Sequence, residues 1–276
     1  MSTDLYANRR LTEGHPELAA RAVQAFTDTQ VEDDARVETT SWLIAYVSRL
    51  REMREGSTVT VVGCGPKPLT CRQLAGQGFV VTAVEPVPGF ARAAETYLGD
   101  TARVVVGAAE QMPLPSNSQD LVVSESILEH VESLRLSLSE MYRLLRPGGV
   151  VWIVTTNKWR FSPTGYNHEF NIPFYNWFPP VVKEAYIFDH LHYRPGLANY
   201  SLRPAVHWLT YAQLCSAGRD VGFSRFYSII DLVSPEDPRL KGRRLRQRVL
   251  AAIKRRPLLR ALALTQVGGT IVMVKE

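Results

Sequence analysis

A β-branched run leads directly into a glycine turn at residues 58–67, with the sequence Thr-Val-Thr-Val-Val-Gly-Cys-Gly-Pro-Lys. A second apolar run at 79–84 ends in an acid, Glu85, which lies 20 positions after Gly65. Such a turn lets a ligand approach the backbone closely, and an acid at the end of the next strand accepts hydrogen bonds from ribose hydroxyls. We therefore expect a nucleoside-containing ligand to bind beside Gly63, Gly65 and Glu85.

Short apolar runs alternate with helix-like segments in the rest of the first half of the chain. Strands are predicted at 58–63, 79–85, 103–107, 121–124 and 150–155, with helices at 69–78, 90–98 and 134–146. Alternation of this kind predicts βαβ crossovers and a parallel sheet with helices on both faces. A helix at 211–221 and strands at 223–232 and 269–275 complete the expected α/β fold, a doubly wound, mostly parallel, seven-stranded Rossmann-like sheet.

Two segments depart from this alternation. Residues 16–55 have a helical pattern, which predicts an N-terminal helical cap over 1–55. Residues 156–207 are rich in aromatic side chains, histidine and proline, and they have little periodicity. Because a long irregular stretch in a compact domain is usually functional, we interpret 156–207 as a substrate-covering insertion after the fifth strand. The ligand-binding domain itself is then expected to comprise 56–155 and 208–276.

The composition is ordinary for a globular protein, with 45% hydrophobic and 21% charged residues. The first twenty residues contain no apolar signal-peptide region, and no run reaches the roughly 20 apolar residues that span a bilayer. The three cysteines, Cys64, Cys71 and Cys215, have no Cys-x-x-Cys spacing. These features favour reduced thiols in a cytoplasmic protein and give no indication of a metal site.

The net charge of +5 comes from one segment. Residues 239–260 contain ten Lys or Arg and no acid, which leaves 22 basic against 27 acidic residues elsewhere. Leu245, Val249, Ala252 and Ile253 fall at helical spacing among the arginines, so a basic amphipathic helix is predicted. Such a helix could contact an anionic membrane surface, hold a phosphorylated substrate or form a solvated face. Nucleic acid is not expected as a partner, since the rest of the body is mildly acidic.

Further motifs follow the glycine turn in a fixed order. They are Gly-Ala-Ala-Glu-Gln-Met-Pro at 107–113, Ser-Gln-Asp-Leu-Val-Val-Ser at 118–124, Glu-His-Val at 129–131 and Glu-Met-Tyr-Arg-Leu-Leu-Arg-Pro-Gly-Gly at 140–149. With these motifs the chain resembles the class I S-adenosylmethionine-dependent methyltransferases, in particular relatives of the quinone-biosynthesis enzymes, over roughly 40–155 and again over 208–276. The resemblance implies S-adenosylmethionine as cofactor. It places the cofactor contacts at Gly63, Cys64, Gly65, Glu85, Pro86, Ala109, Glu110, Ser124 and Glu125.

The motifs depart from the family pattern at three positions. Val61 stands where relatives usually carry an acid that helps to hold the methionine amino group. Lys67 replaces a third glycine and could reach the cofactor's carboxylate or lie in solvent. Ala108 occupies a position in the adenine loop where relatives often have an acid.

Methyl transfer to a hydroxyl requires a base close to the acceptor. His168, flanked by Asn167 and Glu169, is the first candidate, and His190, His192 and His207 are alternatives. Tyr166, Tyr175 and His130 are predicted to contact the substrate. The expected acceptor is a small molecule, a hydroxyl of a natural product or a glycosyl intermediate.

Two other functions fit part of the pattern. A nicotinamide-dependent oxidoreductase shares the glycine turn and the ribose acid, but Pro68 stands where its third glycine should be, and the chain has no Tyr-x-x-x-Lys pair. A non-catalytic module of methyltransferase type would account for Val61 and Lys67. The aromatic insertion argues against a mere binding module, because a module of that kind has less need of a cover that excludes water.

Overall fold

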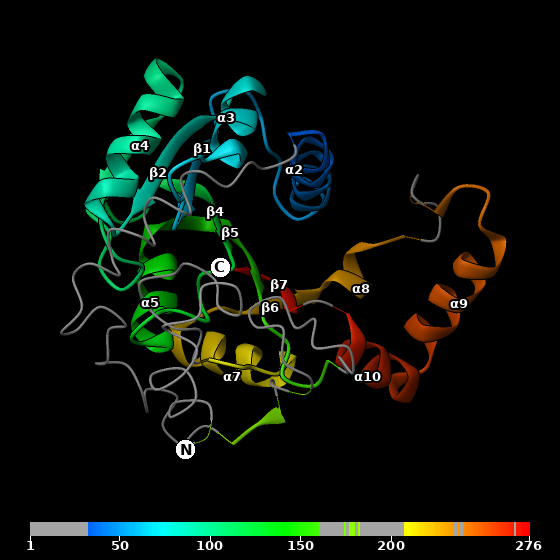
Figure 1. Cartoon of the computed structure of the whole chain (residues 1–276). Coiled ribbons are helices and arrows are strands. Elements are labelled where there is room, and N and C mark those ends of the chain that lie inside the picture. The colour runs from blue at the N-terminus through cyan, green and yellow to red at the C-terminus, as the bar shows by residue number, and fades with distance from the viewer. Residues whose placement is uncertain are drawn as a thin grey trace.

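The computed structural model describes residues 33–160, 174, 177–179, 182, 207–234, 237, 240–267 and 269–276. Its strands form one sheet in the order β3-β2-β1-β4-β5-β7-β6 (Figure 1). The strand bounds are β1 Thr58–Val62, β2 Val80–Glu85, β3 Arg103–Val106, β4 Gln119–Glu125, β5 Leu145–Thr155, β6 Arg225–Ser228 and β7 Gly269–Val274. The first five strands are parallel, and β7 is antiparallel to both of its neighbours. The predicted doubly wound, mostly parallel, seven-stranded sheet is therefore confirmed.

Helices cover both faces of this sheet (Figure 1). Their bounds are α2 Asp33–Val47, α3 Leu69–Gly76, α4 Pro88–Leu98, α5 Leu134–Leu144, α7 Tyr211–Val221, α8 Ile229–Leu232, α9 Arg244–Arg255 and α10 Pro257–Gln266, with a short 3-10 helix η1 at Gly99–Thr101. The helices α2 and α3 supply buried side chains to one apolar cluster, whereas α5 and α7 supply them to the other. The described residues contain no helix that is long and apolar enough to cross a membrane.

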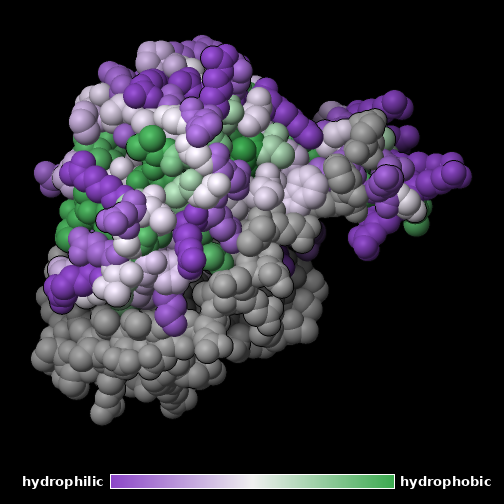
Figure 2. Space-filling view, turned by 90° about the horizontal axis from the view of Figure 1, so that it is seen from above, coloured by the Kyte–Doolittle hydropathy of each residue, from purple (hydrophilic) through white to green (hydrophobic). Residues whose placement is uncertain are grey.

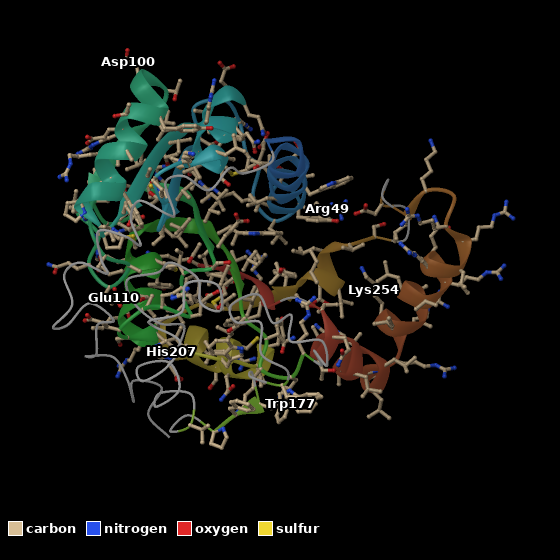
Figure 3. The ribbon with its side chains drawn as sticks, viewed as in Figure 1. Arg49, Asp100, Glu110, Trp177, His207 and Lys254 are labelled. Carbon is tan, nitrogen blue, oxygen red and sulfur yellow. The ribbon has the colours of Figure 1, made fainter. Side chains whose placement is uncertain are left out.

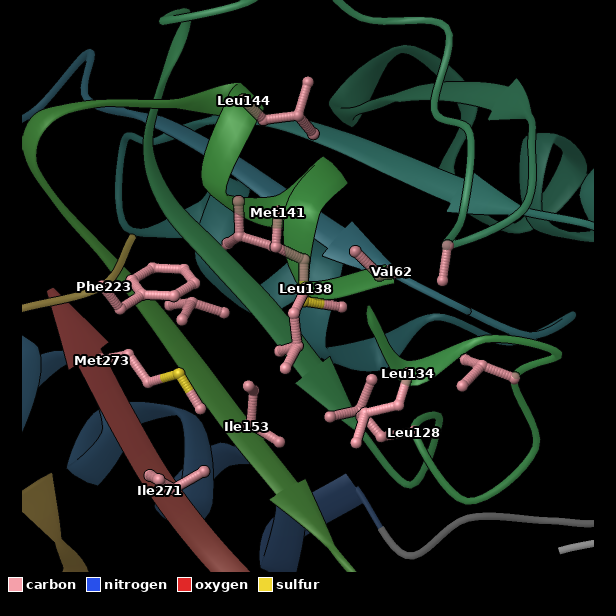
Figure 4. Packing of buried hydrophobic residues seen from close by; sticks show 14 of the residues in the cluster. Val62, Leu128, Leu134, Leu138, Met141, Leu144, Ile153, Phe223, Ile271 and Met273 are labelled. Atoms are coloured by element: carbon pink, nitrogen blue, oxygen red, sulfur yellow. The ribbon is translucent and has the colours of Figure 1, made fainter. Parts of the chain in front are cut away.

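The strands are apolar on both sides because both faces of the sheet are covered. Neighbouring residues of a strand point to opposite faces, so Val122 of β4 joins the cluster under α5 and Val123 joins the cluster under α2 and α3. In the first of these clusters, Leu138 and Met141 of α5 pack towards Ile153 and Met273 of the sheet (Figure 4). This packing holds the carboxyl ends of the parallel strands in a fixed register.

The predicted strand at 223–232 is wrong in its second half. The strand β6 ends at Ser228, and the helix α8 begins at Ile229. The Asp231 carboxylate accepts hydrogen bonds from the backbone N–H of Ser228 at 2.8 Å and from its hydroxyl at 2.7 Å. This reciprocal cap favours a helical turn over further extension of the strand.

The basic segment forms two helices where one amphipathic helix was predicted. The helix α9 contains the predicted apolar positions and ends at Arg255, and α10 begins at Pro257. Proline lacks the N–H that would continue α9 and disfavours helical backbone at the preceding residue, but it fits the first turn of a new helix. The helical prediction is therefore confirmed for α9, and the break follows from Pro257.

The division into domains stays a prediction. The described part of the N-terminal region, α2, packs directly on the sheet, where Tyr46 stacks on Trp152 with ring centroids 6.4 Å apart. The Tyr46 hydroxyl donates a hydrogen bond to the Asp237 carboxylate at 2.5 Å. Residues 1–32 and most of the predicted insertion at 156–207 lie outside the described residues.

Candidate cofactor site at the carboxyl edge of the sheet

The glycine turn follows the carboxyl end of β1. Gly63 and Gly65 have φ values of +65° and +68°, in the left-handed region that favours glycine. The N–H of Gly63 donates to the carbonyl of Val84 at 2.8 Å, which ties the turn to β2. A Cβ atom on Gly63 would collide with the side chain of Ile127. Both the backbone conformation and the lack of space therefore require glycine at position 63.

Glu85 joins the turn to the end of β2. Its side chain is buried, and its two carboxylate oxygens accept hydrogen bonds from the N–H groups of Gly65 at 2.9 Å and Val87 at 3.0 Å. Burial raises the pKa of Glu85, and these two hydrogen bonds oppose that rise. Among the described residues no Lys or Arg pairs with this carboxylate. Since each oxygen accepts one bond from the protein, each keeps a lone pair for a hydroxyl of a ligand.

The end of β4 lies beside the turn, because Ser124 pairs with Val62 across the two strands. The Ser124 hydroxyl is fully buried and has no hydrogen-bond partner among the residues that the structure describes. Two residues later, Ser126 has φ +57° and donates its N–H to the carbonyl of Val154 at 2.7 Å. A non-glycine residue in this region stores strain of a kind that gathers at functional sites. Sequence reasoning missed Ser126, since no residue type or spacing marks it.

The predicted adenine loop contacts the start of α5. Ala109 is buried, and the carboxylate of Glu110 accepts hydrogen bonds from the N–H groups of Glu132 at 2.6 Å and Ser133 at 3.3 Å. Glu110 therefore satisfies free backbone donors at the helix N-terminus, where negative charge is favourable. Sequence reasoning missed this role. The predicted cofactor contact of Glu110 stays a prediction.

The remaining positions of the turn differ in exposure. Burial, together with the charge of Glu85, raises the pKa of the Cys64 thiol to about 12, so the thiol stays protonated at neutral pH. Lys67 and Pro86 are exposed. Val61 packs in the apolar cluster under α2 and α3, where a carboxylate would be desolvated. The valine at this family position is therefore consistent with its surroundings.

His207, just before α7, contacts the loop after β4. The side chain is buried, and its Nε2 atom lies 2.9 Å from the carbonyl oxygen of Val131. The hydroxyl of Thr156 donates to the carbonyl of His207 at 2.9 Å. The hydroxyl of the neighbouring Thr155 donates to the Glu129 carboxylate at 2.7 Å. Figure 3 shows Glu110 and His207 on the same side of the molecule, beside α5.

The structure describes one of the residues predicted to contact the substrate, and its role stays a prediction. His130 is half-buried in the loop after β4, where its N–H donates to the carbonyl of Ile127 at 2.9 Å. The other predicted groups lie outside the described residues: His168, Tyr166, Tyr175, His190 and His192. No group of three or more His, Cys, Asp or Glu side chains suited to a metal ion occurs in the part of the chain that the structure describes.

Comparison with known proteins identifies the class. Residues 61–153 match the family model described as "Methyltransferase domain". An uncharacterized methyltransferase of Mycobacteroides abscessus is 30% identical over 223 residues, which cover 75% of this chain and 82% of the relative. The sterol 24-C-methyltransferase of Pneumocystis carinii is 33% identical over 38% of this chain, and that match covers 29% of the relative's length. The first curated relatives are thus matched over well under half of their own length.

A solved structure agrees with this fold. The S-adenosylmethionine-dependent methyltransferase from Mesorhizobium loti superposes with a TM-score of 0.51 at 18% identity, covering 88% of this chain and 98% of that one. The chain belongs to the class I S-adenosylmethionine-dependent methyltransferases. The predicted family is therefore confirmed, and with it the class of cofactor. The narrower likeness to quinone-biosynthesis enzymes stays a prediction.

Proposed function

We propose that this protein transfers the methyl group of S-adenosylmethionine to a small-molecule acceptor. The observation that carries the proposal is the buried Glu85 carboxylate, which is held by the N–H groups of Gly65 and Val87 and lacks a cationic partner among the described residues. A carboxylate so placed accepts hydrogen bonds from the two hydroxyls of a ribose. Family membership supports the choice of nucleoside.

The cofactor supplies an electrophilic methyl group on a sulfonium. When the cofactor is bound, this methyl group would pass to a lone pair of the acceptor, and a base of this chain would take the acceptor's proton. In this proposal Gly63 and Gly65 admit the cofactor close to the backbone, and Glu85 holds the ribose. The predicted contacts of Cys64, Pro86, Ala109, Ser124 and Glu125 complete the cofactor site.

The proposed acceptor is a hydroxyl of a natural product or a glycosyl intermediate, and the proposed base is His168. The support for His168 is its sequence setting between Asn167 and Glu169, which could fix the tautomer of the imidazole. Tyr166, Tyr175 and His130 are proposed to contact the acceptor. The name of the Pneumocystis carinii relative indicates a carbon acceptor in that protein, so the acceptor atom is the point that an assay must decide.

Calorimetric titration of the full chain with S-adenosylmethionine, S-adenosylhomocysteine and NAD tests the cofactor. Binding of both sulfur nucleosides without binding of NAD supports the proposal, and loss of that binding in Glu85→Ala locates the site. Absence of binding by both sulfur nucleosides would overturn it in favour of a non-catalytic module.

Transfer of a labelled methyl group to a panel of hydroxyl, amine and carbon acceptors then tests the acceptor class. We expect label in the hydroxyl compounds. His168→Ala should lower kcat while the affinity for S-adenosylhomocysteine stays unchanged, and His15→Ala, at a histidine outside the set of candidate bases, serves as the control. Label only in amine or carbon acceptors would contradict the proposed hydroxyl.

A further inference from the structure

The connection between β6 and β7 is far longer than the sheet requires. These strands are antiparallel neighbours, paired from Arg225 with Val274 to Ser228 with Ile271. Two residues are enough to join such a pair. The chain instead runs through α8, α9 and α10 before it returns at Gly269. The fold does not need this extra chain, so residues 240–267, which we call the helical arm, require a separate explanation.

Polar contacts attach the helical arm to the domain, and Leu264 of α10 lies near Leu209 and Leu214. Arg260 of α10 pairs with the Asp231 carboxylate of α8 at 2.7 Å, and Lys254 of α9 donates to the Asp231 carbonyl at 3.2 Å. The Asn157 amide donates to the carbonyls of Leu264 and Val267 at 2.9 and 2.8 Å. Neither helix contributes a fully buried residue, and the arm lies to one side of the sheet (Figure 1). Its outer surface is thus available to a partner.

Both helices of the arm expose a pair of aliphatic side chains to solvent. In α9, Leu245 and Val249 are 75% and 49% exposed, and in α10, Leu258 and Leu262 are 81% and 64% exposed. Each pair has i, i+4 spacing, which places its two side chains on one face of the helix. Grouped apolar exposure of this kind marks interaction surfaces in soluble proteins, in contrast to single scattered residues.

Basic side chains flank the aliphatic pair of α9. With about 3.6 residues per turn, Arg248 lies on one side of the stripe formed by Leu245 and Val249, and Arg246 lies on the other. Both arginines are exposed, and neither has an acidic partner within the described residues. Figure 2 shows hydrophilic side chains over the projecting end of the molecule, and Figure 3 shows Lys254 on the same arm.

We propose that the helical arm binds the surface of an anionic phospholipid bilayer. The aliphatic side chains Leu245, Val249, Leu258 and Leu262 would enter the interface, and Arg246 and Arg248 would lie beside lipid phosphates, as in interfacial amphipathic helices. Binding of nucleic acid would use the arginines and leave the leucines in water. A second copy would bring two segments of the same charge together. An anionic bilayer accommodates both kinds of side chain.

Flotation of the full chain with lipid vesicles tests this proposal. We expect binding to mixed phosphatidylcholine–phosphatidylglycerol vesicles and none to phosphatidylcholine alone. Arg246→Gln with Arg248→Gln should weaken partition about thirtyfold, from about 1 kcal/mol for each arginine. Leu258→Gln with Leu262→Gln should weaken it on the order of tenfold or more, because apolar burial is lost while every charge is kept.

Arg135→Gln with Leu136→Gln is the matched control, since both side chains are exposed on α5, and it should bind vesicles normally. Thermal unfolding shows that each variant is folded. Unchanged vesicle binding by the Leu258/Leu262 variant overturns the proposal, as does failure of the unaltered chain to float with mixed vesicles. A nucleic-acid surface would be identified instead if duplex DNA displaces the unaltered chain from vesicles and if the Leu258/Leu262 variant still binds that DNA normally. Affinity for S-adenosylhomocysteine is measured separately, so failure here leaves the proposed function untouched.

Discussion

Two buried carboxylates lie at opposite ends of the parallel strands, one at the amino ends and one at the carboxyl ends, and they differ in their hydrogen-bond partners. Asp120, at the start of β4, pairs with Arg51 and with Arg146 at 2.8 Å, and it accepts the N–H of Thr58 at 2.8 Å. Burial alone would raise its pKa, but these hydrogen bonds outweigh burial and lower the pKa to about 2. Within the described part of the chain, Glu85, at the end of β2, has two backbone donors and no cationic partner, and burial raises its pKa.

The difference separates a group that stabilises the fold from a group that is kept for a ligand. The charge of Asp120 is neutralised by the two arginines, so the protein itself completes its surroundings. The charge of Glu85 is desolvated without a cation among the described residues, and a ligand that offers hydroxyl donors would relieve this cost. A buried acid with a raised pKa in a ligand-binding edge is a candidate functional residue for this reason.

The largest expected effect is on cofactor affinity. Glu85→Gln removes the charge that strengthens two hydrogen bonds to ribose, and we expect the affinity for S-adenosylhomocysteine to fall on the order of 100-fold. Calorimetric titration measures this change. Glu95→Gln, an exposed acid on α4, is the control and should bind normally. Normal affinity for S-adenosylhomocysteine in Glu85→Gln would contradict the claim that the Glu85 carboxylate binds the ligand.

The second prediction concerns stability at the opposite edge. Asp120→Asn should lower the free energy of unfolding by about 2 kcal/mol at neutral pH, which corresponds to the depression of its pKa in the folded state. Urea unfolding measures the loss. Because the folded pKa is below the unfolded value of about 3.9, this stabilisation is present above about pH 4 and disappears as the pH falls towards 2. A difference between the two proteins that stays constant from pH 7 to about pH 2 would contradict this account of Asp120.

A smaller effect is expected in the glycine turn. Gly63→Ala would hold alanine at φ +65° and press its Cβ against Ile127, so we expect a loss of about 1–2 kcal/mol in unfolding free energy. Gly76→Ala is the control, since a Cβ there meets no atom within 4 Å and a helical alanine should stabilise by about 0.5–1 kcal/mol. Equal effects at both positions would show that the turn is less constrained than the structure indicates.

The regular part of the sheet was predictable because local sequence determines it. The runs at 58–62 and 121–124 consist mostly of valine, leucine and threonine, which fits strands covered on both faces, and Gly63 and Gly65 mark the turn by residue type. The strand predicted at 223–232 failed where the local cap between Ser228 and Asp231 competes with extension. The Ser-x-x-Asp pattern of Ser228 and Asp231 is a local signal for this cap in the sequence.

Other parts of the site depend on contacts between distant residues, which no local pattern reveals. Asp120 meets Arg51 from 69 positions away, and His207 meets Val131 from 76 positions away. Glu110 reaches the start of α5, 22 positions along the chain, so its capping role depends on tertiary packing. The strained backbone of Ser126 likewise follows from how β4 leaves the sheet.

Thermal unfolding with and without saturating S-adenosylhomocysteine tests the central claim most directly when the unaltered chain, Glu85→Gln and Asp120→Asn are compared. We predict that Asp120→Asn lowers the Tm of the free protein and keeps the full ligand-induced rise. In Glu85→Gln the Tm of the ligand-free protein should change by no more than a stability difference of about 1 kcal/mol would cause, because loss of one backbone hydrogen bond is offset by removal of a buried charge. The same variant should lose most of the ligand-induced rise in Tm. Equal loss of the ligand-induced rise in both variants would contradict the division of the sheet into a stabilising edge and a ligand-binding edge.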